Sequence, residues 1–241
     1  MLQNRIHILC TRNIDNALIE HALSGNVAID VISFIKTEHD VTTELWEKVE
    51  DASMKSDALA FTSSNAVEAI ATHQDLQKSR LVGHKIFCIG HATKQCVVKY
   101  FGEKSVAGSA DNARELANAI ITAHVKNLIF FCGDQRRDEL PELLKKDNIE
   151  VKEFIVYKTI ITPKRIEKKY DGILFFSPSA VKGFFQANQL KDETVLFAVG
   201  DTTAEEIKKF SKNKILVSDV PEKKSLLNRA ISYFQTNPIH H

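Results

Sequence analysis

Residues 148–162 read NIEVKEFIVYKTIIT, an alternation of apolar and polar side chains without Gly or Pro. This pattern, rich in Val and Ile, predicts one long β-strand. The strand is too polar along one side to be buried on both faces. An earlier stretch, residues 27–38 (VAIDVISFIKTE), has the same character. We therefore expect a second long strand over residues 27–37.

The two stretches belong to an internal repeat. Ile35-Lys36-Thr37 matches Tyr157-Lys158-Thr159 at a spacing of 122 (157 minus 35). At the same spacing, and without a gap, residues 6–11 align with residues 128–133. Each copy therefore reads as a strand, a helix and a second strand.

A second unit is also duplicated. Residues 57–67 resemble residues 171–181 at a spacing of 114 (177 minus 63), and residues 87–93 resemble residues 197–203. Self-similarity over such lengths predicts two related domains rather than a solenoid. At roughly 120 residues, each half can bury a core of its own.

Strand-like and helix-like segments alternate along the whole chain, which predicts an α/β fold with mainly parallel sheets. The two long strands are the expected connections between the domains. We therefore expect one domain from residues 1–35 and 163–241, a second from residues 40–150, and bridging strands at residues 36–39 and 151–162.

Composition restricts the classes of function. The net charge of +1 leaves no broad basic surface for nucleic acid. Apolar runs are far shorter than the roughly 20 residues of a membrane-spanning helix. The first residues, MLQNRIHILCTR, lack the apolar region and cleavage site of a signal peptide. We expect a cytoplasmic protein without a membrane partner, and a monomer because no apolar stripe requires a second chain.

Cysteines and histidines carry no signature of a metal site or a nucleophile. Cys10, Cys88, Cys96 and Cys132 have no CxxC spacing, and three of them fall in predicted buried strands. This favours small buried hydrophobes in a reducing compartment. The histidines form no HExxH pattern, and the chain has no GxGxxG, P-loop or GxSxG motif. A dinucleotide enzyme is therefore disfavoured.

One feature recurs at the predicted strand ends. Small hydroxylated residues or glycine follow strand after strand and open a helix. They are Thr11, Ser63-Ser64, Thr93, Ser109, Gly133, Ser177-Pro178-Ser179 and Gly200-Asp201-Thr202-Thr203. Ligands of open parallel sheets bind beyond these strand ends, where each helix N-terminus favours an anion by about 0.3–1 kcal/mol. The alternative interpretation is that these residues are ordinary helix caps.

Tyr157 differs from its repeat partner Ile35. A phenol with a reference pKa of about 10 is protonated at neutral pH and can donate a proton or a hydrogen bond. The alternative interpretation is a rim tyrosine on an edge strand, where β-propensity favours it in any case.

Several short motifs, in their order and spacing over nearly the whole chain, resemble those of the uroporphyrinogen-III synthase family. They are Ile8-Leu9-Cys10-Thr11-Arg12, Phe61-Thr62-Ser63-Ser64-Asn65-Ala66-Val67, Ile89-Gly90, Asn112-Ala113, Val156-Tyr157-Lys158-Thr159, Phe176-Ser177-Pro178-Ser179-Ala180-Val181 and Val199-Gly200-Asp201-Thr202-Thr203-Ala204.

The resemblance implies two doubly wound, Rossmann- or flavodoxin-like parallel-sheet domains. They are joined by a two-stranded antiparallel β-ladder, with the active site in the cleft between them. It also implies a reaction without metal or organic cofactor. Linear hydroxymethylbilane, which bears acetate and propionate on every pyrrole, loses water. Its ring D is inverted through a spiro intermediate, and the macrocycle closes as uroporphyrinogen III.

Carried over by motif, Tyr157 matches the family's tyrosine that assists departure of the substrate hydroxyl. The expected substrate-binding residues are Thr11, Arg12, Ser63, Ser64, Asn65, Thr93, Asn112, Gly133, Ser177, Ser179, Ala180, Thr202 and Thr203. The two copies differ at two of these positions. Phe176 in one copy corresponds to Thr62 in the other, and His91 corresponds to Asp201.

Two other classes of function are open to this sequence. A two-lobed α/β protein that binds a small ligand without catalysis would also have crossing strands, although the absent export signal and Tyr157 argue against it. An inactive interaction module would show neither turnover nor ligand binding.

Overall fold

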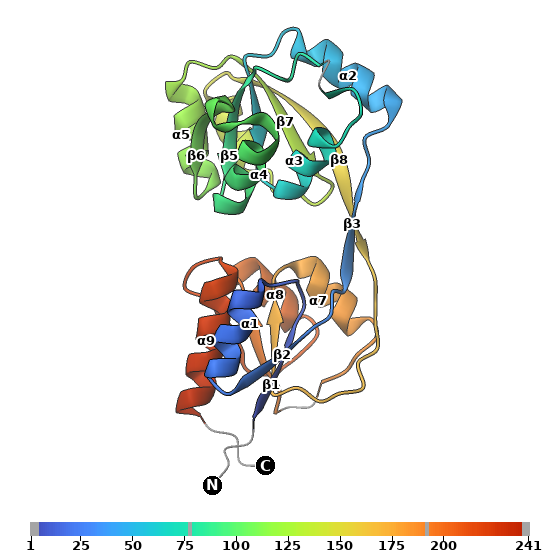
Figure 1. The fold of residues 1–241 in the computed structure, drawn as a ribbon, viewed down its shortest axis with the longest axis vertical. Helices are drawn as coiled ribbons and strands as arrows, with labels where there is room; N and C mark the ends of the chain where they lie inside the picture. Colours follow the sequence, from blue (N-terminus) through green and yellow to red (C-terminus); the bar gives the residue numbers. More distant parts are fainter. Residues whose placement is uncertain (1–4, 77–78, 191–192, 238–241) are drawn as a thin grey trace. The chain divides into compact units, whose positions relative to one another are not determined.

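The computed structural model describes residues 5–76, 79–190 and 193–237. It consists of two compact units, one comprising residues up to Lys36 and from Ile160 onward, the other Thr37–Thr159 (Figure 1). Both chain crossings between the units therefore lie within the two stretches that the repeat pointed to.

Unit 1 contains a five-stranded sheet in the order β11-β10-β9-β1-β2, and its pairs are parallel. Its strands are β1 (Ile6–Cys10), β2 (Val27–Val31), β9 (Gly172–Phe175), β10 (Val195–Ala198) and β11 (Ile215–Val217). Its helices are α1 (Asn16–Ser24), α7 (Pro178–Phe185), α8 (Asp201–Lys208) and α9 (Lys223–Thr236).

Unit 2 contains the six-stranded sheet β3-β8-β7-β4-β5-β6, parallel except for the antiparallel pair β3–β8. Its strands are β3 (Ile35–His39), β4 (Ala58–Phe61), β5 (Lys85–Ile89), β6 (Val106–Ala110), β7 (Asn127–Gly133) and β8 (Glu150–Ile161). Its helices are α2 (Thr43–Ser53), α3 (Ser64–Ala71), α4 (His91–Phe101), the 3₁₀ turn η2 (Glu103–Ser105), α5 (Ala113–Thr122) and α6 (Glu139–Lys146).

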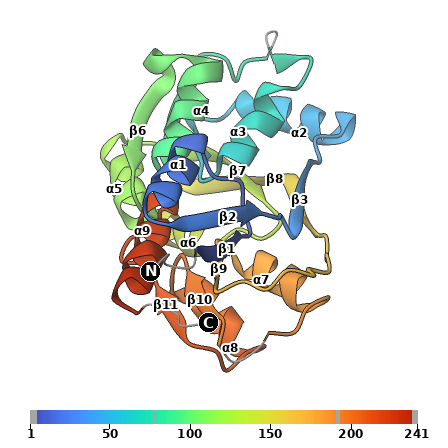
Figure 2. The ribbon, with the colours of Figure 1, turned by 60° about the horizontal axis from the view of Figure 1, so that its bottom comes forward.

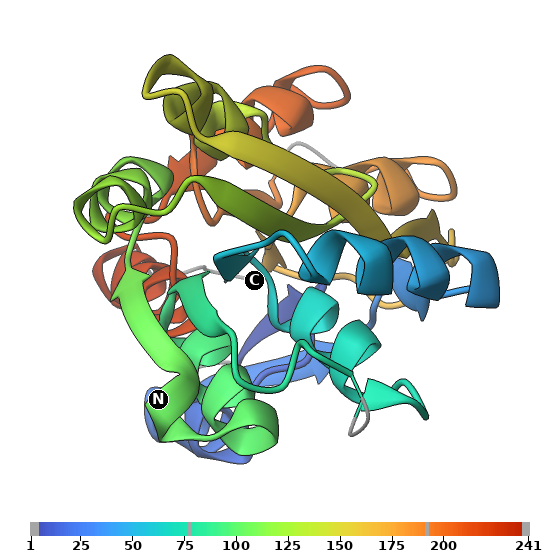
Figure 3. The same ribbon diagram turned by 90° about the horizontal axis from the view of Figure 1, so that it is seen from above.

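Helices cover both faces of each sheet, so the inner strands β4, β7, β9 and β10 are almost wholly buried, whereas β3 and β8 keep exposed charged residues. In unit 1, α1 and α9 pack on one face, and α7 and α8 on the other (Figure 2). In unit 2, helices α2, α3 and α4 share one core, and α5 and α6 the other; α2 (blue) and α6 (olive) lie on opposite sides of the sheet in Figure 3. The expected α/β class is confirmed.

The two sheets repeat one strand order. Unit 1 reads β2-β1-β9-β10-β11, and unit 2 reads β8-β7-β4-β5-β6 with β3 added at its edge. Strands that correspond in sequence thus occupy the same place in each sheet. The internal duplication is therefore also a structural one.

The gapless alignment at a spacing of 122 is wrong for the first strand of the repeat. Ile8 pairs with Gly172, and Leu128 pairs with Ala58. Since Gly172 and Ala58 correspond at a spacing of 114 (172 minus 58), Ile8 corresponds to Leu128 at a spacing of 120 (128 minus 8). A shift of two residues leaves every side chain on its face, so the apolar pattern could not reveal it.

The expectation of a single strand over residues 27–37 is also wrong. The structure has two strands there, β2 and β3, separated by residues 32–34. At the break, the fully buried Phe34 packs edge-to-face against Phe184, with ring centroids 5.2 Å apart. A Cβ on Gly183 would lie 2.4 Å from the carbonyl oxygen of Phe34. The break thus lets the chain leave one sheet for the other with Phe34 in the unit 1 core, whereas β8 is one continuous strand as expected.

Candidate active site

Most predicted site residues of unit 2 come together at one edge of its sheet. Neighbouring parallel strands end at the same edge, and β4, β5 and β6 each lead directly into a helix there. The predicted residues at this edge are Ser63, Ser64, Asn65, Thr93, Asn112 and Gly133. Ligands of such sheets bind beyond this edge.

Several of these side chains already make capping contacts. The Oγ of Ser63 accepts the backbone N–H of Asn65 at 3.2 Å, and the Oδ1 of Asn112 accepts that of Glu115 at 3.0 Å. Thr93 is buried. For Ser63 and Asn112, the helix-cap interpretation therefore describes a contact that the structure contains.

The predicted residues of unit 1 gather at the corresponding edge of the other sheet. They are Thr11 and Arg12 after β1, Ser177, Ser179 and Ala180 at α7, and Thr202 and Thr203 in α8. Of these, Arg12 and Thr202 are exposed, whereas Thr11, Ser179, Ala180 and Thr203 are buried.

Two of the unit 1 hydroxyls are already engaged. The Oγ1 of Thr11 donates to the carbonyl of Leu174 at 2.8 Å, which ties β1 to β9. The Oγ of Ser177 accepts the backbone N–H of Ala180 at 3.2 Å, as the Oγ of Ser63 does for its own helix. These hydroxyls order the strand ends and helix starts from which a ligand contact would be made.

Helices α4 and α8 are repeat counterparts, and each begins after a glycine. Gly90 precedes α4 and Gly200 precedes α8, and neither N-cap has a side-chain cap hydrogen bond. The first turn of α8 carries Asp201, whereas that of α4 carries no acidic residue. Because a carboxylate repels an incoming anion, the N-terminus of α4 is electrostatically the better anion site.

Tyr157 lies at the same edge of the unit 2 sheet as the starts of α3, α4 and α5. It belongs to β8 and is paired with Gly133, the last residue of β7. Strand β8 lies between β3 and β7, so Tyr157 is not on an edge strand, and that part of the alternative interpretation is wrong. Next to it, Lys158 pairs with Asp40 at 2.7 Å. The phenol is thus placed where a ligand of this sheet would bind.

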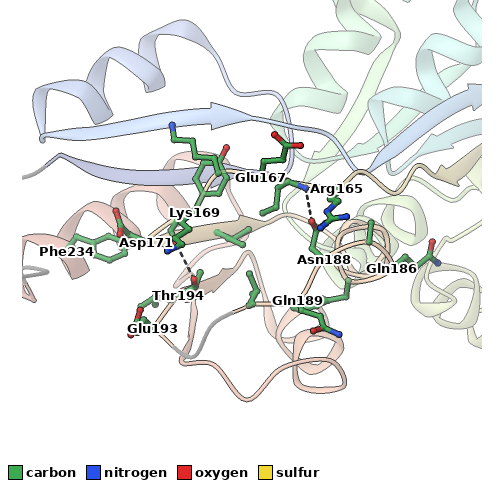
Figure 4. Close-up of a pocket in the computed structure, with 18 of the residues that line it drawn as sticks. Arg165, Glu167, Lys169, Asp171, Gln186, Asn188, Gln189, Glu193, Thr194 and Phe234 are labelled. Atoms are coloured by element: carbon green, nitrogen blue, oxygen red, sulfur yellow. Dashed lines mark hydrogen bonds between the residues drawn. The ribbon is translucent and has the colours of Figure 1, made fainter. Parts of the chain in front are cut away.

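A cavity of about 1050 Å³ lies at the opposite edge of the unit 1 sheet, beside the residues that precede β9 and β10 (Figure 4). Arg165 and Lys169 line it together with Glu167, so charges of both signs are present. The Oδ1 of Asn188 accepts the N–H of Ile166 at 2.8 Å, which makes this amide structural. None of the predicted site residues lines this cavity. They lie at the carboxyl ends of the strands, where ligands of open parallel sheets bind.

The cysteines are unsuited to nucleophilic chemistry. All four are free and buried. Burial raises the pKa of the Cys10 thiol, and that of Cys132, to about 11.

Among the residues that the structure describes, His, Cys, Asp and Glu do not gather in groups that could hold a metal ion. Within the same residues, no helix is long and apolar enough to cross a membrane.

Sequence comparisons identify one family. The model of a family described as uroporphyrinogen-III synthase HemD matches residues 21–228. The uroporphyrinogen-III synthase of Saccharomyces cerevisiae is 29% identical over 210 residues, which cover 73% of this chain and 76% of that protein. That of Schizosaccharomyces pombe is 24% identical over 185 residues, covering 70% and 71% respectively.

Solved structures share the fold at low identity. The uroporphyrinogen-III synthetase of Helicobacter pylori superposes with a TM-score of 0.67 at 15% identity, covering 95% of this chain and 99% of that one. A mutant uroporphyrinogen III synthase from Thermus thermophilus gives 0.64 at 12% identity, covering 96% and 99%. Both have the architecture described above.

Proposed function

Because this chain belongs to the uroporphyrinogen-III synthase HemD family, with a match that includes most of both units, we propose that Tyr157 and the carboxyl-end edges of its two sheets act on the substrate. As a member it forms uroporphyrinogen III from hydroxymethylbilane in tetrapyrrole biosynthesis, a hydro-lyase reaction. The family match carries this assignment. The roles of individual residues are inferred from geometry and chemistry.

Tyr157 acts as the proton donor for loss of water. The phenol donates its proton to the hydroxyl of the substrate's terminal hydroxymethyl group, the C–O bond breaks, and water departs to leave an azafulvene cation. Closure of the macrocycle later releases a proton, which restores the phenol. The position of Tyr157 opposite the last residue of β7, at the ligand-binding edge of unit 2, supports this role.

The substrate carboxylates are held mainly by backbone groups. The N-terminus of α4, capped by Gly90 without a side-chain hydrogen bond, supplies N–H donors and partial positive charge. The exposed guanidinium of Arg12 supplies a full charge in unit 1. Ser63 and Ser177 contribute by fixing the first turns of α3 and α7. The chain therefore binds a polyanion with a net charge of only +1.

The protein works as a monomer in the cytoplasm. The four buried, free cysteines support a reducing compartment, because disulfides are rare there. Size-exclusion chromatography with light scattering tests the monomer, and fractionation of the source cells tests the compartment. A dimer mass, or recovery outside the cytoplasm, would contradict these two points without touching the chemistry.

A coupled assay tests the reaction. Freshly made hydroxymethylbilane is supplied, and the products are oxidised and separated into type I and type III isomers. Unassisted closure gives type I. We expect the type III isomer to rise in proportion to added protein. Formation of type I alone, at the rate without protein, would show that this chain lacks the activity.

The variant Tyr157→Phe tests the proton donor. We expect kcat to fall about 10- to 100-fold. General acids contribute about 10²- to 10⁴-fold to a rate, so this loss lies at or below the lower end of that range. Activity persists because holding the linear substrate in a closed shape supplies the rest of the acceleration. Tyr233→Phe, in α9 of unit 1, is the matched control and should leave kcat unchanged. Unchanged turnover of Tyr157→Phe would remove Tyr157 from the mechanism.

A further inference from the structure

The pairing of β7 with β8 is irregular at one point. Pairs run in step as far as Cys132 with Ile155, but the next pair is Gly133 with Tyr157. Val156 is therefore an extra residue in β8, which makes a β-bulge at the end of β7. Bulges of this kind redirect a side chain and are over-represented beside active sites.

The bulge decides which face Tyr157 occupies. Val156 is fully buried in the core beneath α2, α3 and α4, and Tyr157 packs against the same core. In a regular strand, successive side chains point to opposite faces. Tyr157 would then share the face of Ile155, which is 46% exposed. The extra residue therefore brings the phenol to the α2–α4 side of the sheet.

Gly133 provides the space that the ring occupies. A Cβ built on Gly133 would lie 2.3 Å from Cζ and 2.7 Å from the phenolic oxygen of Tyr157. Real Cβ atoms do not approach other atoms so closely, and the atoms it would meet belong to the hydroxyl-bearing end of the ring. Only hydrogen fits there, so space rather than backbone conformation requires glycine at this position.

The loop after Gly133 fixes the strand immediately beyond the ring. The backbone N–H of Asp134 donates to the carbonyl of Tyr157 at 3.1 Å. The carboxylate of Asp134 accepts the N–H of Thr159 at 3.0 Å. The backbone that carries the phenol is therefore tied at two points to the residue that follows Gly133.

We propose that Gly133, opposite the bulge in β8, is a positioning residue that sets the direction of the Tyr157 phenol. This inference rests on the proposed role of Tyr157. The role proposed for Gly133 differs from the substrate contact expected from the sequence. A side chain at position 133 would rotate or displace the ring from its donor geometry, and a misplacement of about 1 Å can cost 10²-fold in rate.

A double-mutant cycle between Gly133→Ala and Tyr157→Ala tests the proposal, with kcat, KM and the urea midpoint measured for each chain. With Tyr157 present, we expect Gly133→Ala to lower kcat at least about tenfold with little change in KM, and to lower the midpoint. In the Tyr157→Ala chain, the methyl group added by Gly133→Ala has room. There, Gly133→Ala should change neither kcat nor the urea midpoint further.

Gly108→Ala is the matched control for loss of stability. A Cβ there would meet the ring of Phe87 at 2.9 Å, also in unit 2 but away from Tyr157. This variant should lower the urea midpoint without lowering kcat, and Tyr157→Ala should not relieve its effect. A fall in kcat from instability alone would appear in both glycine variants and would overturn the positioning role.

Two further outcomes would contradict the proposal in distinguishable ways. If Gly133→Ala lowers kcat by the same factor with and without the Tyr157 ring, Gly133 acts on the substrate directly. If the Tyr157→Ala chain retains full activity, the proposed proton donor fails and the positioning role fails with it. In that case the urea midpoints would still show coupling between the two residues, which assigns the failure to the chemistry rather than to the contact.

Discussion

Asp57 and Asp171 make the same pair of contacts in the two halves of the chain. The backbone N–H of Asp57 donates to the carbonyl of Asn127 at 2.8 Å, and its carboxylate accepts the N–H of Asn127 at 2.8 Å. Asp171 does the same with His7, at 2.8 and 2.7 Å. Each aspartate thus ties the start of its own strand to the start of the neighbouring one, and the spacing of 120 between His7 and Asn127 (127 minus 7) agrees with the corrected repeat.

Removal of the Asp57 carboxylate should lower stability in a pH-dependent way. Hydrogen bonds from the backbones of Asn127 and Lys126 lower the pKa of Asp57 in the folded protein. A pKa below the unfolded value gives stability that is present above about pH 4. This stability is lost as the pH falls through the folded pKa. We expect Asp57→Ala to reduce the free energy of unfolding by about 1–2 kcal/mol at pH 7 and by progressively less in acid.

Urea denaturation of the two chains between pH 7 and pH 3 measures this dependence. Asp51→Ala, which removes an exposed carboxylate of α2, is the control and should change the free energy of unfolding at pH 7 by no more than about 0.5 kcal/mol. A loss of stability in Asp57→Ala that is the same at pH 7 and pH 3 would show that the charge of Asp57 is not the stabilising element.

Asp201 should weaken substrate binding at the N-terminus of α8. Its carboxylate lies in the first turn, where it opposes the attraction of the helix for an anion. We expect Asp201→Asn to lower KM for hydroxymethylbilane about two- to fivefold, since the dipole interaction is worth 0.3–1 kcal/mol at an exposed site. The gain should shrink at high salt, because ions screen exposed charges. Glu205→Gln, further along the same helix, is the control; an unchanged KM in Asp201→Asn would exclude this helix from carboxylate binding.

The sequence predicts those features of the fold that depend on local pattern. The alternation of strand-like and helix-like segments predicted the α/β class, and the duplication predicted two related sheets. Pattern could not locate the break at residues 32–34, because Ile32 and Phe34 are as apolar as the strand around them. The position of the break depends on where Phe34 packs in the core of unit 1. The whole fold, rather than the local sequence, determines that position.

The sequence likewise predicted only part of the candidate site. Small residues at strand ends predicted the edges of both sheets, and the contrast with Ile35 singled out Tyr157. The sequence could not decide between a substrate contact and a helix cap for Ser63 and Ser177, both of which cap their helices. Nor did it reveal that Gly133 faces the Tyr157 ring, because that contact requires a bulge between strands whose register depends on tertiary pairing.

The buried thiols should resist alkylation in the folded protein. With a pKa of about 11, Cys10 and Cys132 are thiolates in only about one molecule in a thousand at pH 8, and the thiolate is the reactive form. Mass spectrometry after iodoacetamide treatment should find these two residues unmodified in the native protein and all four cysteines modified in urea. Rapid native modification of Cys10 would show that the end of β1 opens to solvent.

Gly183 should stabilise the break between β2 and β3 by leaving room for the backbone of Phe34. In a helix interior, Gly→Ala ordinarily gains about 1 kcal/mol from propensity. Here the new Cβ would lie 2.4 Å from the Phe34 carbonyl oxygen and 3.2 Å from Cγ2 of Ile161. Because the first contact is with backbone, it cannot be relieved by rotating a side chain, and overpacking of this kind costs about 1–3 kcal/mol or more. We therefore expect Gly183→Ala to reduce the free energy of unfolding by up to about 2 kcal/mol, whereas Lys182→Ala, an exposed neighbour in α7, should change it by only a few tenths. A Gly183→Ala chain more stable than the parent in urea would mean that α7 can move away from Phe34 freely, and that the break is not held by this contact.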